Sequence, residues 1–164
     1  MGAGKSTIGK RLAKRLGMPF LDSDEEVEKA ADQTIADMFE RYGEASFRDG
    51  ERRVISRLVG GEPKVIATGG GAFMDAETRA LIVERTISVW LDADPVTLAY
   101  RVSRRDHRPL LRGKDPLEVL RGLATVRNPV YAEAALHIRS EEAPHERTVE
   151  RIIEALAGWT GQAR

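Results

Sequence analysis

The sequence predicts an α/β fold with a mostly parallel sheet. Short runs of β-branched and apolar residues, such as residues 64–68, alternate with longer segments in which apolar residues recur at helical spacing. Glycine-rich stretches stand at two junctions, one before a basic helical segment at the N-terminus and one, Gly69-Gly70-Gly71, directly after the run at 64–68. Alternation of this kind is typical of strands joined by crossover helices.

Each expected element has a local signal. Gly17 and Gly43 end helical stripes, Asp75 is placed to cap a helix, and Pro95 stands in a first helical turn. We therefore expect strands at residues 19–22, 64–68, 87–91 and 136–139, and helices at 5–16, from 25 onward, 35–43, 47–58, 76–83, 96–105, 116–131 and 149–156.

Composition narrows the class of protein. The chain has 164 residues, of which 41% are hydrophobic and 32% charged, and this suits a single domain over residues 1–164. Cysteine is absent, which excludes disulfides and thiolate catalysis. Lysine plus arginine equals aspartate plus glutamate at 26 each, so we expect no nucleic-acid or membrane partner. The sequence has no apolar run long enough to span a bilayer and no visible signal peptide, so we expect a cytoplasmic location.

The N-terminal segment matches the second half of the phosphate-binding pattern G-x-x-x-x-G-K-[ST]. In such loops the backbone N–H groups and the following helix N-terminus bind phosphate oxygens. Lys5 would reach the β- and γ-phosphates, and Ser6 would place its hydroxyl on Mg²⁺. The alternative is a glycine-capped basic helix without a nucleotide. The matching residues are Gly2, Ala3, Gly4, Lys5, Ser6 and Thr7.

The first glycine of the pattern and the strand before it are missing from this chain. In folds of this kind that strand is central, so the sheet would have a gap with exposed edges on both sides. We expect the natural start to lie upstream, with Met1 an internal methionine.

Two carboxylates follow an apolar pair in the segment Asp22-Ser23-Asp24. On an extended segment, side chains two residues apart point the same way. One carboxylate could support a metal ion, and the other could orient a substrate hydroxyl or accept its proton. The alternative is that Ser23 or Asp24 caps the next helix.

The glycine triplet permits close approach of the backbone to a ligand, whereas a plain flexible connector would more often contain Ser, Asn or Asp. Three arginines are candidate anion ligands: Arg48, with Glu51 one turn later, Arg108 and Arg127. Each has an ordinary alternative, respectively a helical ion pair, a solvated loop residue and a partner of the helix dipole.

Taken together, these segments resemble the bacterial shikimate kinases in order and spacing over essentially the whole chain. The P-loop alone is unspecific, but the combination is highly specific. The segments are residues 1–9, Asp22-Ser23-Asp24, Phe47-Arg48-Asp49-Gly50-Glu51, Gly69-Gly70-Gly71, Arg108-Pro109-Leu110-Leu111 and Arg127-Asn128-Pro129-Val130-Tyr131.

The resemblance implies a three-layer α/β/α P-loop kinase fold like that of the nucleoside monophosphate kinases, with a parallel five-stranded sheet. It also implies a shikimate-binding helical region at about 24–59, a lid at about 104–115 and a monomer. The implied reaction transfers the γ-phosphoryl group of ATP to the 3-hydroxyl of shikimate, with Mg²⁺, on the route to chorismate and aromatic amino acids.

The resemblance also implies residue roles. Gly2, Ala3, Gly4, Lys5, Ser6 and Thr7 bind the ATP phosphates, Ser6 and Asp22 serve the metal, and Arg101 lies near adenine. Asp24 is the candidate base, and Lys5 and Arg108 assist phosphoryl transfer. Asp24, Arg48, Gly70 and Arg127 bind shikimate. Phe39, Phe47, Glu51, Pro109 and Leu110 match the surroundings of the pocket.

Two other functions remain open from the sequence. A gluconate-type kinase would also have a P-loop and an acidic pair, although the glycine triplet and Phe47-Arg48 argue against it. An inactive nucleotide-binding remnant is the second alternative, because the N-terminal strand is absent.

Overall fold

The computed structural model describes residues 2–103, 115–140 and 144–161. These residues form two compact units. The loop unit comprises Met1–Ile8 and Ser88–Arg164, and the triplet unit comprises Gly9–Ile87. The single domain expected from the sequence stays a prediction.

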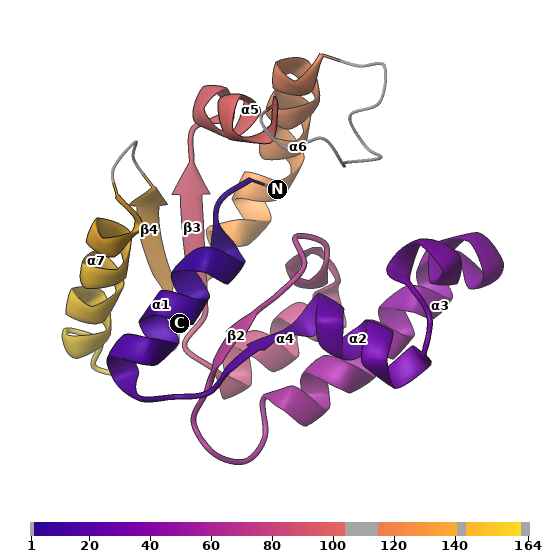
Figure 1. The fold of residues 1–164 in the computed structure, drawn as a ribbon, viewed down its shortest axis with the longest axis horizontal. Helices are drawn as coiled ribbons and strands as arrows, with labels where there is room; N and C mark the ends of the chain where they lie inside the picture. Colours follow the sequence, from indigo (N-terminus) through magenta and orange to yellow (C-terminus); the bar gives the residue numbers. More distant parts are fainter. Residues whose placement is uncertain (1, 104–114, 141–143, 162–164) are drawn as a thin grey trace. The chain divides into compact units, whose positions relative to one another are not determined.

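Helices and strands alternate along the described chain, as an α/β protein requires (Figure 1). The elements are α1 (Lys5–Leu16), β1 (Phe20–Asp22), α2 (Ser23–Ala31), α3 (Ile35–Leu58), β2 (Val65–Ala67), the 3₁₀ helix η1 (Ala72–Met74), α4 (Ala76–Arg85), β3 (Val89–Ala93), α5 (Pro95–Ser103), α6 (Pro116–Tyr131), β4 (Leu136–Ser140) and α7 (His145–Ala157).

All strand pairing in the described residues is parallel, which confirms the predicted strand direction. In the triplet unit β1 pairs with β2, with Phe20 opposite Val65. In the loop unit β3 pairs with β4, with Val89 opposite Leu136. The described residues thus contain four strands in two pairs, and the five-stranded sheet stays a prediction.

The core of the triplet unit joins α2 to α3 and α3 to the turn after β2. One cluster of buried side chains contains Val27, Met38, Phe47, Val54 and Leu58. A second contains Ile55, Ala72 and Ile82, from α3, η1 and α4. The two clusters bury different sides of the C-terminal part of α3, because Val54 and Ile55 are neighbours about 100° apart on the helix. The helix is therefore fixed on both sides.

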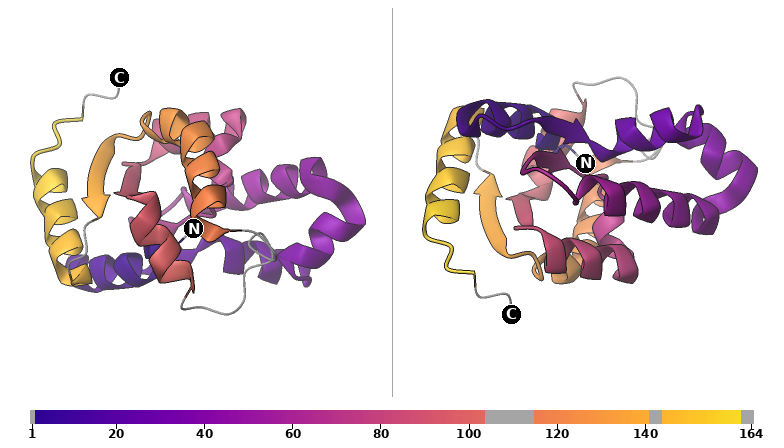
Figure 2. Two further views of the ribbon diagram at one scale, coloured as in Figure 1. Left: turned by 90° about the horizontal axis from the view of Figure 1, so that it is seen from above. Right: turned by 90° about the horizontal axis from the view of Figure 1, so that it is seen from below.

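In the loop unit, α7 lies alongside β4, and α5 lies against α6 (Figures 1 and 2). Ile138 of β4 and Val149 and Ile152 of α7 are buried. On β3 the ring of Trp90 stacks on His137 of β4, with ring centroids 4.1 Å apart. Parallel pairing places these two residues directly opposite each other.

Most element boundaries agree with the sequence, and the exceptions have local causes. Helix α3 continues through residues 35–58, but Gly43 has φ 75° and ψ 173°, so the predicted break occurs there as a kink. The strand expected at 87–91 lies at Val89–Ala93, and just before it the carbonyl of Ser88 accepts from the N–H of Leu136. The helix expected from 149 begins earlier, at His145.

Within the described part of the chain, every helix is too short or too polar to cross a bilayer.

Candidate functional site

The glycine loop before α1 has the backbone geometry that an anion site requires. Gly2 and Gly4 have φ values of 76° and 80°, in the left-handed region that favours glycine. The carbonyl of Gly4 accepts from the N–H of Ile8 at 2.8 Å, so the helix begins directly after the loop. Lys5 and Ser6 consequently lie in the first turn, where N–H groups and the helix dipole favour phosphate.

Three further residues of the loop unit bear on the site, and one of them contacts this turn. The ring of His145, the first residue of α7, lies against the loop, since a Cβ atom on Gly4 would be 3.3 Å from its Nε2. Arg101 of α5 donates from Nη1 to Oγ of Ser140 at 3.4 Å. Arg127 lies in the last turns of α6 and is half-buried.

The expectation that Asp22 and Asp24 share one face of an extended segment is wrong. Asp22 ends β1, but Ser23 already begins α2, so Asp24 lies in the first helical turn. The alternative, in which Ser23 or Asp24 caps the next helix, is wrong as well. Asp22 is the N-cap, and its Oδ1 accepts from the N–H of Asp24 at 3.1 Å. The helix starts early because this carboxylate satisfies one of its first N–H groups.

The glycine triplet brings three predicted residues together. The space above Gly69 is occupied by Oδ1 of Asp24 and Oε1 of Glu51, and the space above Gly71 by the guanidinium of Arg48. All three side chains belong to the triplet unit, two from α3 and one from the start of α2.

A second contact ties the same turn to α2. The N–H of Gly69 donates to Oγ of Ser23 at 3.4 Å, and Ser23 is fully buried. The turn therefore has both a backbone tether and packed side chains.

Arg48 is held in a charged pair at the centre of this arrangement. Its Nη1 donates to Oε2 of Glu51 at 2.6 Å, and its Nη2 donates to Oε1 of Glu44 at 3.3 Å. The side chain of Glu51 is 2% exposed and that of Arg48 is 23% exposed. The guanidinium therefore keeps an accessible face while its partner is buried.

The pKa values of this pair follow from burial and pairing. Burial raises the pKa of Glu51, against the opposing effect of Arg48, and the charges of Asp24 and Asp75 add to the rise. For Arg48, burial alone would lower the pKa, but the hydrogen bonds and charges of Glu51 and Glu44 raise it. Arg48 is therefore a permanent cation, which suits recognition of a carboxylate.

Two aromatic rings flank the same guanidinium. Cζ of Arg48 lies 5.1 Å from the ring centroid of Phe47 and 5.9 Å from that of Phe39. The rings pack together at 4.5 Å, and Phe47 also belongs to the core. The two rings therefore stabilise the guanidinium through cation–π contacts in addition to their packing.

The turn ends at a capped helix. Oδ1 of Asp75 accepts from both the N–H and the hydroxyl of Thr78, at 2.9 and 2.8 Å. These hydrogen bonds lower the pKa of Asp75. The sequence predicted this cap.

The residues fit a magnesium ion held mainly by phosphate oxygens. Among the described residues, no cluster of three or more His, Asp or Glu side chains could hold a metal ion by itself. Mg²⁺ commonly takes one or two protein oxygens together with substrate phosphates. The Ser6 hydroxyl, in the first turn after the glycine loop, is a ligand of that kind.

Some candidates lie elsewhere, and some partners escaped the sequence argument. Arg108, Pro109 and Leu110, together with most of the expected lid, lie outside the described residues. Glu44 was missed, although its position four residues before Arg48 on a helical stretch was a usable signal. His145 gave no local signal, because its contact with Gly4 joins residues far apart in the sequence.

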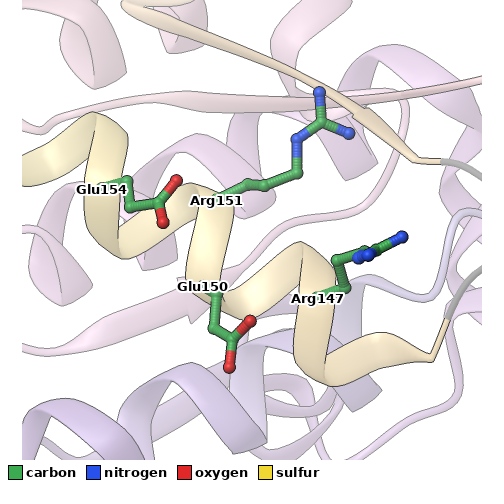
Figure 3. A pocket seen from close by; sticks show the side chains of 4 residues that line it. All are labelled: Arg147, Glu150, Arg151 and Glu154. Carbon is green, nitrogen blue, oxygen red and sulfur yellow. The ribbon is translucent and has the colours of Figure 1, made fainter.

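A surface pocket opens over α7 and is lined by four charged residues (Figure 3). They are Arg147, Glu150, Arg151 and Glu154, all from one helix face. Arg151 donates to the backbone carbonyl of Arg139 at 3.0 Å. None of the four is a predicted site residue, and opposite charges three and four residues apart are ordinary on a solvated helix face.

The sequence matches the family model described as shikimate kinase over residues 1–157. A shikimate kinase of Caulobacter vibrioides is 58% identical over 156 residues, covering 95% of this chain and 78% of the relative. A shikimate kinase of Zymomonas mobilis is also 58% identical over 156 residues, covering 95% of this chain and 89% of the relative.

Solved structures agree with these matches. The shikimate kinase from Acinetobacter baumannii in complex with shikimate is 36% identical, with a TM-score of 0.87, and covers 99% of this chain and 91% of its own. A gluconokinase from Sinorhizobium meliloti is 17% identical with a TM-score of 0.53, a likeness that shows the fold alone.

Proposed function

This chain belongs to the shikimate kinase family, and we propose that it transfers the γ-phosphoryl group of ATP to the 3-hydroxyl of shikimate. The products are shikimate 3-phosphate and ADP, in the biosynthesis of chorismate and aromatic amino acids. The observation that carries the proposal is the position of Arg48, Asp24 and Glu51 against the glycine triplet, in a chain that matches the family over residues 1–157.

Shikimate is a small acid with several hydroxyl groups, so its site needs cations for the carboxylate and acceptors for the hydroxyls. Arg48 meets the first need, because it is charged, partly exposed and held by Glu51. Arg127 is the proposed second cation for the shikimate carboxylate, and the backbone of Gly70 is proposed to contact the ligand. The planar guanidinium can bind a carboxylate through two parallel hydrogen bonds.

Asp24 is the proposed base. Its carboxylate would accept a hydrogen bond from the 3-hydroxyl and take the proton as the oxygen attacks the γ-phosphorus. In that step the O–H bond breaks, a new O–P bond forms, and the bond from the γ-phosphorus to the β–γ bridging oxygen breaks, so that ADP leaves with those electrons. The position of its carboxylate against Gly69 supports this role.

The nucleotide phosphates would bind the glycine loop, Gly2 to Thr7, through backbone N–H groups, with Lys5 reaching the β- and γ-phosphates. When bound, Mg²⁺ neutralises phosphate charge. Ser6 would hold it directly and Asp22 would support it. Arg101 is proposed to contact the adenine, and Arg108 the phosphates.

We further propose that a strand upstream of Gly2 completes a five-stranded parallel sheet, and that the protein is a single-domain, cytoplasmic monomer. The two separate strand pairs support the first point, since each pair has a free edge that another strand could join. A longer version of the chain that lacked an apolar segment before the glycine loop would contradict it.

A coupled ADP-release assay tests the function directly. Purified chain is given ATP, Mg²⁺ and either shikimate or gluconate, alongside a version extended upstream. We expect turnover with shikimate only, and faster turnover in the extended version. Turnover with gluconate and none with shikimate would reject the proposal, and no turnover by either version with either acid would favour an inactive remnant.

A further inference from the structure

Gly69 and Gly71 are not explained by backbone conformation. The described glycines with positive φ are Gly2, Gly4, Gly17, Gly43, Gly61 and Gly161, and neither Gly69 nor Gly71 is among them. Gly71 has φ −86° and ψ −24°, which is ordinary right-handed helical geometry. Any residue could adopt that backbone, so the reason for glycine must lie in the space around it.

That space is filled by two proposed substrate-binding side chains. A Cβ atom on Gly71 would lie 2.7 Å from both Cζ and Nη1 of Arg48, and closer still to its Nη2. A Cβ atom on Gly69 would lie 2.6 Å from Oδ1 of Asp24 and 3.4 Å from Oε1 of Glu51. Non-bonded carbon atoms do not approach other heavy atoms to 2.6–2.7 Å, so Arg48 and Asp24 would have to move, whereas 3.4 Å from Glu51 is close to ordinary contact.

Arg48 is held in its present position by several contacts. Its guanidinium is bound on one side to Glu51 and Glu44, and it lies over the rings of Phe39 and Phe47. Any displacement away from Gly71 therefore breaks a hydrogen bond or leaves the aromatic support. Side chains fixed in this way hold one geometry, which is what tight binding of a small acid requires.

We propose that Gly69 and Gly71 are positioning residues for the shikimate side of the reaction. The missing Cβ atoms let the Asp24 carboxylate and the Arg48 guanidinium lie directly on the turn after β2. Gly71 thereby sets the place of the group that binds the substrate carboxylate, and Gly69 sets the place of the group that meets the reacting hydroxyl. The proposal rests on the proposed function.

The proposal separates function from stability. The atoms that an added Cβ would displace are the far ends of flexible side chains, not backbone. Such atoms can shift without moving the backbone and without breaking the Arg48–Glu51 pair completely, so folding free energy should change far less than when Arg48 is removed. A shift of about 1 Å at a reacting group nevertheless has a large effect on rate. A glycine that served packing alone would show the opposite pattern, with a loss of stability and little change in kinetics.

The experiment compares Gly71→Ala and Gly69→Ala with wild type in the coupled assay. For Gly71→Ala we expect the KM for shikimate to rise by about tenfold or more, as when a charge-assisted hydrogen bond is weakened, with the KM for ATP unchanged. For Gly69→Ala we expect kcat to fall by about tenfold or more. Thermal unfolding should change little in either variant.

Gly50→Ala is the matched control. Gly50 lies in α3 next to Glu51, and a Cβ atom there would meet nothing within 4 Å. We expect both KM values and kcat to stay at wild-type levels. Equal kinetic defects in the control and in the triplet variants would overturn the proposal, because glycine flexibility and not space would then be the cause.

A double-mutant cycle gives an independent test. In an Arg48→Ala background the added methyl group meets no guanidinium, so Gly71→Ala should change shikimate affinity less than twofold there. If Arg48→Ala fails to fold, Arg48→Met with Glu51→Gln replaces it, since neither charge is then left unpaired. A full, additive effect of Gly71→Ala in these backgrounds would overturn the proposal.

Failure of the inference and failure of the proposed function give different results. If the wild-type chain and its upstream extension do not consume ATP in the presence of shikimate, the function is wrong. If they do, and Gly69→Ala and Gly71→Ala are kinetically indistinguishable from wild type, the function stands and the positioning role is wrong.

Discussion

The two glycine-rich turns of this chain use glycine for different physical reasons. In the loop before α1, Gly2 and Gly4 have positive φ, so the residue supplies a backbone conformation that presents N–H groups to phosphate. In the triplet after β2, the outer glycines supply empty space for Arg48 and Asp24. A phosphate is recognised by backbone, whereas a hydroxylated acid is recognised by side chains that the backbone must leave room for.

The difference extends to the groups behind each turn. The loop is followed by a helix whose N-terminus attracts any phosphate, which explains how one loop can serve many kinases. The triplet is backed by a buried Glu51, a paired Arg48 and two aromatic rings. If the proposed roles hold, selectivity for the acceptor comes from these side chains and from Arg127.

The largest expected effects are on turnover, one from each turn. Asp24→Asn should lower kcat by at least about a hundredfold, since an amide cannot accept the hydroxyl proton. Lys5→Ala should also remove most turnover, by loss of charge at the transferred phosphoryl group. Steady-state kinetics of the upstream-extended protein measures both. Normal kcat in Asp24→Asn would exclude a base role there.

Arg48→Ala should raise the KM for shikimate strongly and leave the KM for ATP near its wild-type value. It should also lower the free energy of unfolding by about 3–5 kcal/mol near pH 7, because Glu51 stays buried without its partner. The double variant Arg48→Ala, Glu51→Gln should regain much of that stability and none of the shikimate affinity. Urea unfolding and kinetics together separate the two effects, and equal recovery of both would contradict the assigned roles.

Gly4→Ala tests a glycine that is needed for its positive φ, in contrast to Gly71, which is needed for its missing Cβ atom. A left-handed φ costs a non-glycine residue about 1–2 kcal/mol, and the added methyl group would also stand 3.3 Å from Nε2 of His145. We expect a higher KM for ATP with little change in the KM for shikimate. This is the reverse of Gly71→Ala, and a shared pattern in the two variants would remove the distinction.

The smallest expected effect concerns the cap that ends the triplet turn. The hydrogen bonds from Thr78 lower the pKa of Asp75, so the folded state binds its proton more weakly than the unfolded state does. Its extra stability is therefore present above the unfolded pKa and is lost as the pH falls through the lower folded pKa.

Asp75→Asn keeps a capping oxygen but does not titrate. Wild type should be more stable than Asp75→Asn by about 0.5–1 kcal/mol near pH 7. The difference should shrink as the pH falls from about 5 to 3, measured by urea unfolding at each pH. A difference that is constant over this range would show that the charge contributes nothing.

Much of the fold was open to prediction because its signals are local. Glycine stops, the Asp75 cap, Pro95 and apolar periodicity placed α1 and α6 correctly and the other elements within a few residues. The predicted starts of α2 and β3 were wrong because contacts with other residues set where these elements begin. Asp22 capped α2 and moved its start to Ser23, and pairing with β4 moved the start of β3.

The sequence by itself determined the class of fold, the phosphate-binding loop and the kinds of residue that a shikimate site needs, because residue type and spacing along the chain carry that information. Only the tertiary structure decided which of those residues meet. That Asp24 lies on Gly69 and Arg48 on Gly71 depends on packing between segments 45 and 23 residues apart, and no local pattern records such contacts. The sequence shows the three glycines, but the reason proposed for Gly69 and Gly71 rests on the positions of the Asp24 and Arg48 side chains, which only the structure gives.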